Sequence, residues 1–260
     1  MQTCCLIIPT YNNASTLLQV IESAKTYSNY IIVVNDGSTD DTHALLQGMG
    51  ENGRDKGRMD EEEQIIEIVE YKINRGKGYA LRCGFKRAVQ AGFRYAITLD
   101  ADGQHYASDI PRFIAAIAET PDALLVGSRF LEQENMPAKN SFANRFSNFW
   151  YHLQTLRYLP DTQSGFRLYP VQKMRRMHFF CNRYEAELEM LVRLSWRLIP
   201  VKAIPVSVYY APAGERVSHF RPFLDFFRIS LLNTLFTVVA VVYFYPKLLI
   251  WKLIKLNTPK

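Results

Sequence analysis

The chain has 260 residues, of which 48% are hydrophobic, and it carries a formal net charge of +6. This length suits one large α/β domain with an appendage, or two small domains, and the hydrophobic content is ample for a packed core. The positive charge suits anionic partners, namely nucleic acid, phosphorylated substrates or an anionic membrane surface, without choosing among them. The four cysteines have neither metal-binding nor redox spacing, so we expect free thiols in a reducing compartment.

Short apolar segments alternate with helical patterns through the first half of the chain. We expect strands over residues 4–8, 31–34, 65–71, 95–99 and 123–126. We expect helices over residues 15–25, from 42 onwards, after 78 and from about 108 to 119, with N-caps supplied by Asp40-Asp41-Thr42 and Ser108-Asp109. Residues 48–64 are polar and rich in glycine and charge, which indicates a mobile surface insertion. Nearly continuous apolar strands that alternate with helices indicate an α/β fold with a parallel sheet buried on both faces.

The second half of the chain has a different character. We expect helices over residues 141–158 and 185–196 and a strand over residues 201–209. Residues 229–246 carry no charge and have basic flanks, and this run is near the lower limit of ~17–25 residues for crossing a bilayer. We therefore expect a catalytic domain over residues 1–215 and a membrane-associating helical segment over residues 216–260, which either spans the bilayer or lies in its interface.

The segment from Asp100 to His105, with the sequence DADGQH, directly follows the apolar run that ends at Leu99. Two carboxylates at this spacing repel each other, and burying them is costly. A divalent metal ion that carries a nucleoside diphosphate would relieve both problems, because such an ion takes a few hard oxygen ligands and keeps other positions for phosphate and water. The motif therefore indicates metal-assisted transfer from a nucleotide-activated donor.

Polar motifs follow each of the five strands expected in the first half. They are Pro9 to Asn12, Asn35 to Gly37, Asn74 to Gly78, Asp100 to Gln104, and Gly127 to Arg129. In parallel sheets ligands gather at the carboxyl ends of the strands. The five motifs therefore predict one convergent site.

With these motifs assembled, the chain resembles family 2 glycosyltransferases of the GT-A fold. The resemblance rests on the sequences PTYN at Pro9, NDGS at Asn35 and DAD at Asp100. Within that family the chain is most similar to the polyprenyl-phosphate branch, dolichol-phosphate mannosyltransferase and its bacterial relatives, through DADGQH, the sequence GSR at Gly127 and the sequence SGFR at Ser164. The resemblance implies a Rossmann-like, mostly parallel sheet flanked by helices.

The resemblance also implies roles for single residues. Residues expected to bind the donor nucleotide are Pro9, Tyr11, Asn13, Asn35, Asp36, Lys77, Asp100 and Ala101. Residues expected to hold Mg²⁺ or Mn²⁺ are Asp100, Asp102 and Gln104, with Asp102 as the main ligand. The chain departs from the branch at Asn13, where an acidic residue is common, and at Asn35-Asp36, where a double Asp is common. The base therefore stays open, and the donor is a GDP- or UDP-sugar.

The acceptor decides which further residues the reaction needs. A lipid monophosphate has a second pKa of ~6 and needs no general base, only cations that hold it near an anionic donor. The candidate cations are Arg129, Arg145, Arg167 and Arg216. A sugar hydroxyl as acceptor would need a carboxylate base, for which Asp161 is the first choice and Glu187 the second.

Together these patterns predict a metal-dependent, inverting glycosyltransferase. We expect it to transfer one sugar to a membrane-embedded acceptor, polyprenyl phosphate before any other, at the cytoplasmic face of a membrane. Two alternatives are a family 2 enzyme with a hydroxyl acceptor, such as a glycolipid, polysaccharide or pigment, and a membrane subunit that binds nucleotide sugar without turnover. Nucleic acid is not expected as a partner, because the basic residues near the C-terminus interleave with apolar ones, as at a membrane surface.

Overall fold

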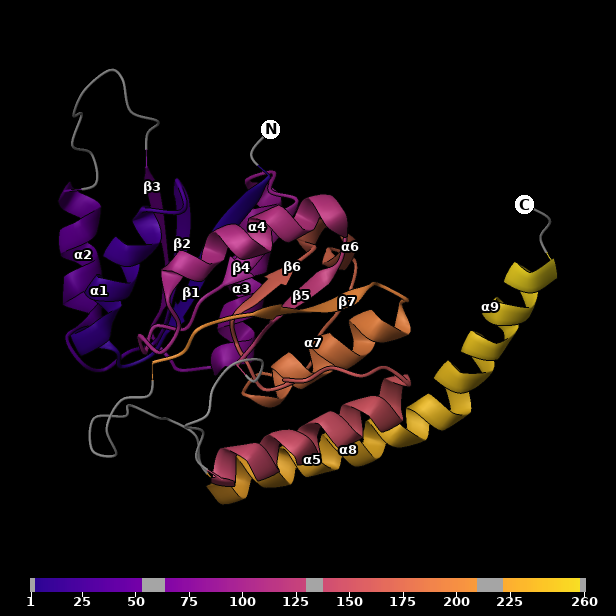
Figure 1. The fold of residues 1–260 in the computed structure, drawn as a ribbon. Coiled ribbons are helices and arrows are strands. Elements are labelled where there is room, and N and C mark those ends of the chain that lie inside the picture. The colour runs from indigo at the N-terminus through magenta and orange to yellow at the C-terminus, as the bar shows by residue number, and fades with distance from the viewer. Residues whose placement is uncertain (1–2, 53–63, 130–137, 210–221, 258–260) are drawn as a thin grey trace.

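The computed structural model describes residues 3–52, 64–129, 138–209 and 222–257. A seven-stranded sheet forms its centre, in the order β3-β2-β1-β4-β6-β5-β7 (Figure 1). The strands are β1 (Cys4–Thr10), β2 (Tyr30–Asp36), β3 (Ile65–Tyr71), β4 (Tyr95–Thr98), β5 (Leu124–Ser128), β6 (Arg167–Tyr169) and β7 (Val201–Pro205). All pairs are parallel except the two that β6 makes. The expected α/β fold is therefore confirmed.

Both faces of the sheet are apolar, as the uninterrupted hydrophobic strands predict. In β1, Cys5 and Ile7 contribute to one core cluster, whereas Leu6 and Ile8 contribute to the other. This alternation follows from the two-residue period of a strand, and a strand covered on both sides needs apolar side chains at every position.

Helices cover each face of the sheet. One face packs against α1 (Ala14–Lys25), α2 (Thr42–Asn52) and α4 (Ile110–Glu119), the last preceded by a short 3₁₀ turn, η1 (Ala107–Asp109). The other face packs against α3 (Lys77–Gln90), α6 (Val171–Met174) and α7 (Glu185–Trp196). Outside α7 lie α5 (Ala138–Thr155) and α8 (Pro222–Val239), which run side by side in Figure 1.

Strand β6 is missing from the sequence-based expectations. It has three residues and pairs antiparallel with β4, where Thr98 faces Arg167, and with β5, where Leu125 faces Leu168. A strand this short, with a charged residue in it, has no readable period. The sheet is therefore mixed rather than wholly parallel.

Other features differ from expectation, among them the ends of two helices and the hydrogen bond of one cap. The helix α2 continues to Asn52 through the start of the expected insertion, whose residues 53–63 lie outside the described part of the chain. The helix α5 ends at Thr155, before Leu156 with its positive φ of 54°. Asp109 occupies the N-cap position of α4 as expected, but its side chain makes no cap hydrogen bond and instead accepts one from the backbone N–H of Ser207 at 2.7 Å. Asp40 does act as expected, because its Oδ1 accepts a hydrogen bond from Thr42 N at the start of α2.

The C-terminal helix is continuous from α8 through a π-helical turn, η2 (Ala240–Phe244), into α9 (Tyr245–Asn257). Among the described residues, one helix, Leu224–Lys255, is long and apolar enough to cross a membrane by length and composition, with a mean hydropathy of 1.7. Its inner side packs on the body of the protein. Trp196 of α7 contacts Phe236 with ring centroids 5.2 Å apart, and the amide of Gln154 in α5 donates to Asn233 Oδ1 at 2.9 Å. Figure 1 shows α9 extending beyond the sheet.

The outer side of this helix is apolar, although its inner side is apolar too and contributes Leu232, Phe236 and Phe244 to the core. Leu224, Phe227 and Leu231 are 52%, 67% and 61% exposed. Asp225 is instead buried at 2% and lies 3.4 Å from Arg228 Nη1. A helix in water would normally present its apolar side to the core.

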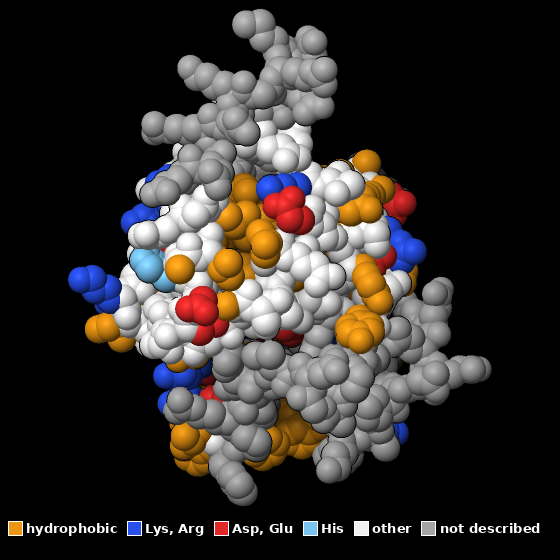
Figure 2. Space-filling model, turned by 90° about the vertical axis from the view of Figure 1, so that its left-hand side faces the viewer, with side chains coloured by type: hydrophobic (Ala, Val, Ile, Leu, Met, Phe, Trp, Pro, Cys, Tyr) orange, Lys and Arg blue, Asp and Glu red, His pale blue; other side chains and the backbone are white. Residues whose placement is uncertain are grey.

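The face on the left of Figure 1 is drawn in Figure 2. Its described Lys and Arg side chains lie in small separate groups, with acidic and hydrophobic side chains between them. On this face the positive charge of the described residues is therefore not gathered into one patch.

Candidate active site

The loops that follow β1 and β2 are joined to each other by Asn12. Its Oδ1 accepts a hydrogen bond from Thr39 N at 2.7 Å, and its backbone N–H donates to Ser38 Oγ at 3.0 Å. Of the residues expected beside it, Pro9 and Asn13 are buried, and Tyr11 is partly buried with its backbone N–H donating to Asn13 Oδ1 at 3.4 Å. Asn12 thus positions the loop in which donor-binding residues are expected, a role that the sequence motif did not reveal.

Asp36 connects the end of β2 to the start of α3. Its carboxylate accepts hydrogen bonds from the backbone N–H groups of Arg75 at 2.7 Å and Gly76 at 2.8 Å, and from the amide of Asn74 at 3.1 Å. Asp36 is only 3% exposed, so these hydrogen bonds replace the water that its carboxylate would otherwise bind. Its neighbour Asn35 donates to Glu70 Oε1 at 2.8 Å. The structure thus places both side chains as supports of the loops that follow β2 and β3.

Lys77 is the first residue of α3 and lies between two acids. Its Nζ is 2.7 Å from Asp100 Oδ1 and 3.2 Å from Glu187 Oε1. Burial alone would lower the pKa of Lys77, but the two carboxylates outweigh it and raise that pKa. Likewise, burial would raise the pKa of Asp100, but Lys77 holds it below its ordinary value. Lys77 and Asp100 therefore stabilise each other's charged forms.

Two glycines allow this cluster to form. At Gly78 a Cβ would collide with the Cβ of Ala186, so the absence of a side chain lets α3 approach α7 and brings Lys77 to Glu187. At Gly165 a Cβ would lie 2.5 Å from Asp100 Oδ2 and 2.7 Å from Lys77 Nζ. The backbone at Gly165 thus closes the cluster from the side of β6. The sequence motif SGFR contains Gly165, but only the neighbours in space reveal what the glycine is for.

Asp102 lies on the same loop as Asp100 and is partly exposed. Its Oδ1 accepts a hydrogen bond from Gln104 N at 3.0 Å. Burial, together with the negative charge of Asp100, raises the pKa of Asp102 to about 6. Between them, Ala101 is buried and its carbonyl accepts a hydrogen bond from Thr16 Oγ1 at 2.6 Å, which fixes the loop against α1.

These residues fit a metal ion that arrives with a diphosphate. Among the described residues, no three His, Cys, Asp or Glu side chains form a ready metal cage. Asp102, with Asp100 and Gln104 beside it, offers a small set of carboxylate and amide oxygens. Mg²⁺ and Mn²⁺ favour such ligands, and Mg²⁺ is commonly held by one or two carboxylates plus substrate phosphates.

Arg129 and Asp161 form a buried ion pair at the end of β5. The Asp161 carboxylate accepts hydrogen bonds from Arg129 Nε at 2.7 Å and Nη2 at 3.1 Å, and Asp161 is 0% exposed. This fork-to-fork geometry fixes the direction of the guanidinium. Asp161 is therefore the support of Arg129 rather than a carboxylate open to an acceptor.

Arg167 and Arg145, which are also expected to bind phosphate, form no ion pair with Asp161. Arg167 is fully buried, and its guanidinium donates to the carbonyls of Ser164, Thr162 and Glu187 at 2.7–2.9 Å. The expectation that Arg167 binds acceptor phosphate is therefore wrong for this structure, because its donors hold the SGFR loop and α7. Arg145 is exposed on α5. Arg216 lies outside the described residues.

His105 ends the DADGQH segment and packs against Phe166. Its ring lies 5.3 Å from the ring of Phe166, and burial lowers its pKa to about 4. No described residue forms a hydrogen bond with its Nδ1.

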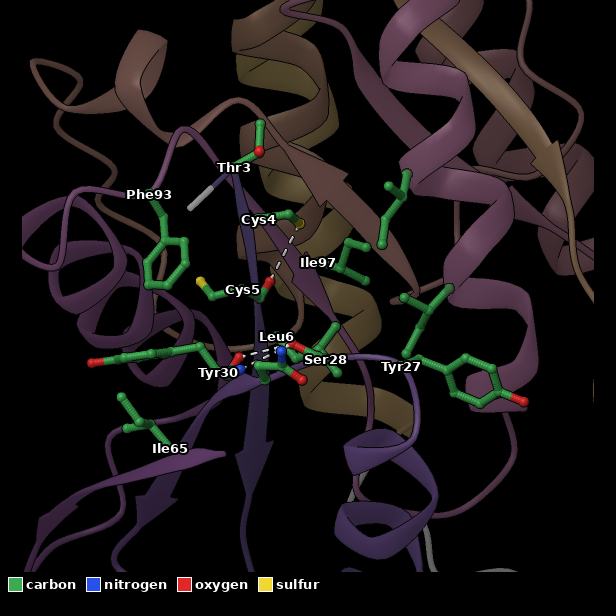
Figure 3. Close-up of a pocket in the computed structure, with 13 residues that line it drawn as sticks. Thr3, Cys4, Cys5, Leu6, Tyr27, Ser28, Tyr30, Ile65, Phe93 and Ile97 are labelled. Atoms are coloured by element: carbon green, nitrogen blue, oxygen red, sulfur yellow. Dashed lines mark hydrogen bonds between the residues drawn. The ribbon is translucent and has the colours of Figure 1, made fainter. Parts of the chain in front are cut away.

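A separate cavity of about 540 Å³ lies at the opposite edge of the sheet, where the strands begin (Figure 3). Figure 3 labels the side chains of Cys4, Tyr30 and Phe93 around it. The cavity shares no residue with the motifs at the carboxyl ends of the strands, so it does not belong to the candidate site.

The fold and the gathered motifs define an α/β protein whose candidate ligand site is the carboxyl edge of the sheet. The chain belongs to glycosyl transferase family 2, because the family described as "Glycosyl transferase family 2" matches residues 5–180. It is therefore a glycosyltransferase, as the motifs predict.

Similar proteins support this assignment. The chain is 29% identical to UDP-N-acetylglucosamine--dolichyl-phosphate N-acetylglucosaminyltransferase of Methanococcus voltae, over 79% of this chain and 85% of that one. It is 26% identical to dolichyl-phosphate beta-glucosyltransferase of Saccharomyces cerevisiae, over 78% of this chain and 65% of that one. The crystal structure of S. aureus TarS 1-349 in complex with UDP-GlcNAc matches with a TM-score of 0.57 at 17% identity, over 90% of this chain and 66% of that one. This likeness shows the GT-A fold.

Proposed function

We propose that this protein transfers a sugar from a UDP-sugar to the phosphate of a membrane-embedded polyprenyl phosphate, with inversion at the anomeric carbon and with Mg²⁺ or Mn²⁺ bound at Asp102. The relatives named above act on dolichyl phosphate by their names, and the Methanococcus voltae enzyme is named for UDP-N-acetylglucosamine. These names favour a uridine donor over the guanosine alternative.

The choice of acceptor rests on the burial of Asp161 and its pairing with Arg129. A sugar hydroxyl would need a carboxylate base in contact with it. Asp161 is fully buried and holds Arg129 with both oxygens, and Glu187 faces Lys77. Both carboxylates expected as bases are thus engaged with cations. A phosphate acceptor needs no base, which supports polyprenyl phosphate over a hydroxyl acceptor.

The proposed reaction is a single displacement. One oxygen of the lipid phosphate forms a bond with the anomeric carbon while the bond from that carbon to the diphosphate oxygen breaks, and both electrons of that bond leave with UDP. A metal ion bound with the donor would supply Lewis-acid stabilisation of the charge on the leaving diphosphate. Asp102 and Gln104 would hold that ion, the loop positioned by Asn12 would hold the nucleoside, and Arg129, fixed by Asp161, would orient the acceptor phosphate.

The C-terminal helix supports attachment to a membrane. Its outward side chains are apolar, its one acid in the first turn, Asp225, is buried, and Lys247 and Lys252 follow the apolar run. Phe149 is also exposed, and it belongs to α5, the helix that is hydrogen-bonded to α8. We propose that α8 and α9 place the site at the cytoplasmic surface, with the catalytic part over residues 1–215 and the membrane-associating part over residues 216–260.

The test uses purified full-length protein with radiolabelled UDP- and GDP-sugars, polyprenyl phosphate and Mn²⁺. We expect an acid-labile lipid-linked sugar from one UDP-sugar and no product after chelation of the metal. Transfer to an alkyl glycoside but not to polyprenyl phosphate would assign the hydroxyl acceptor instead. Donor binding without transfer to either acceptor, in folded protein, would refute the enzyme proposal.

A further inference from the structure

The Lys77 ammonium lies between Asp100 and Glu187, where its positive charge offsets the negative charge of these two carboxylates. It is 2.7 Å from Asp100 Oδ1 and 3.2 Å from Glu187 Oε1, and its side chain is 19% exposed. With Asp102 on the same loop, three carboxylates and one ammonium share a small volume. Lys77 therefore neutralises part of the charge that makes this place attractive to a divalent ion.

The position of Lys77 is tightly defined. The close approach of α3 to α7 at Gly78 fixes the start of α3, and the backbone at Gly165 leaves no room on the far side of Nζ. Asp100 is held by the same neighbours, because its Oδ1 faces Lys77 and its Oδ2 faces Gly165. Of the two acids in the DAD motif, Asp102 is thus the one that does not contact this ammonium at ion-pair distance.

We propose that Lys77 is a resident counter-ion that makes metal binding depend on the donor, and that Glu187 is the positioning residue that keeps Lys77 against Asp100. This inference rests on the proposed function, because it concerns the ion expected at Asp102. Without the donor, a divalent ion meets a site whose negative charge Lys77 has already reduced. A nucleoside diphosphate adds negative charge that attracts both cations, so metal and donor strengthen each other's binding by the same factor.

The proposal predicts opposite effects for the two partners of the ion pair. Lys77→Met removes a positive charge beside the metal site, so the donor-free protein should bind Mn²⁺ about tenfold more tightly or better. Glu187→Gln removes a negative charge and should weaken Mn²⁺ binding by a similar factor. The double variant should return close to the wild-type affinity. General damage to the site would weaken binding in all three.

The experiment measures free Mn²⁺ by electron paramagnetic resonance during titration of the full-length protein, with and without UDP, at constant ionic strength. Lys77→Arg keeps the charge but crowds the cluster, so tighter Mn²⁺ binding in Lys77→Met and not in Lys77→Arg identifies the charge rather than the packing as the cause. Glu185→Gln makes the same change as Glu187→Gln two residues earlier, on the other side of α7, and should leave the affinity unchanged. Circular dichroism melting verifies that each variant is folded.

In the wild type, UDP should tighten Mn²⁺ binding, and in Lys77→Met this coupling should shrink as the donor-free affinity rises. Mn²⁺ binding to Lys77→Met that is equal to or weaker than that of the wild type, while UDP still tightens binding in the wild type, overturns the counter-ion proposal and leaves the proposed function standing. If the wild type binds no Mn²⁺ even with UDP, the metal dependence in the proposed function fails, and the counter-ion proposal fails with it. Should Lys77→Met not fold, Lys77→Gln gives the same charge change.

Discussion

Gly165→Ala tests whether the backbone of the SGFR loop holds the charged cluster in place. The new methyl group would lie 2.5 Å from Asp100 Oδ2, 2.7 Å from Lys77 Nζ and 3.1 Å from Glu187 Oε1. All three distances are shorter than van der Waals contact, so either the loop or the three side chains must move. Overpacking of this kind costs about 1–3 kcal/mol of folding free energy.

Gly165→Ala should change both the Tm and the transfer rate. For a chain of this size that cost lowers Tm by roughly 2–12 °C. A displacement of the Asp100 loop by about 1 Å would reduce the transfer rate by about 10²-fold. Differential scanning fluorimetry and the transfer assay with UDP-sugar and polyprenyl phosphate measure the two effects.

The matched control is Gly48→Ala on α2. Its Cβ would meet nothing within 4 Å, so the same substitution should stabilise the helix by about 0.5–1 kcal/mol and leave transfer unchanged. If Gly165→Ala retains both the Tm and the transfer rate of the wild type, the backbone at Gly165 does not constrain the cluster, and our account of the SGFR loop is wrong.

Three further predictions concern the metal site, the buried ion pair and the outer helix surface. Asp102→Asn should reduce Mn²⁺-dependent transfer by at least about 10²-fold with little change in Tm, measured over a range of Mn²⁺ concentrations; a rate near that of the wild type would remove Asp102 from the metal site. Asp161→Asn leaves Arg129 without its carboxylate, so we expect a loss of about 3–5 kcal/mol in chemical unfolding and a pH–rate profile of unchanged shape. Disappearance of the acidic limb of that profile, on which the rate falls as a base is protonated, would instead identify Asp161 as a general base. Phe227→Asp and Leu231→Asp should each weaken vesicle flotation at least about tenfold without changing Tm, because both side chains are exposed; unchanged flotation would place the membrane contact elsewhere.

Most of the sheet could be predicted from the sequence because strands such as β1 and β2 carry nearly continuous apolar runs. Ile31 to Val34 alternates between the two core clusters, and so short an apolar run before turn residues favours a strand over a helix. The gathering of the motifs at one edge also followed, because parallel strands end at the same edge. Strand β6 could not be predicted from the sequence, because its pairing depends on β4 and β5 rather than on any pattern in its own three residues.

The contacts of single side chains were harder to predict. A guanidinium in the sequence can bind a phosphate or cap carbonyl groups, and Arg167 does the latter because β6 draws it into the core. Asp161 is likewise a strong candidate base by residue type, yet its pairing with Arg129 depends on the distance between β5 and the segment after α5. Lys77 and Glu187 were each named from the sequence, but their contact depends on the packing of α3 on α7.

The inner side of the C-terminal helix determines how the protein can be shortened. Phe236 and Phe244 cover Trp196, and the amide of Gln154 has its partner at Asn233. A chain truncated after residue 215 would expose this indole and leave the buried amide without its partner. The same α7 carries Glu187 near its first turn and Trp196 at its end. Attempts to obtain a soluble catalytic fragment by deleting the C-terminal helix should therefore yield aggregates with a disturbed site, and solubilisation is better sought by polar substitutions on the outer side.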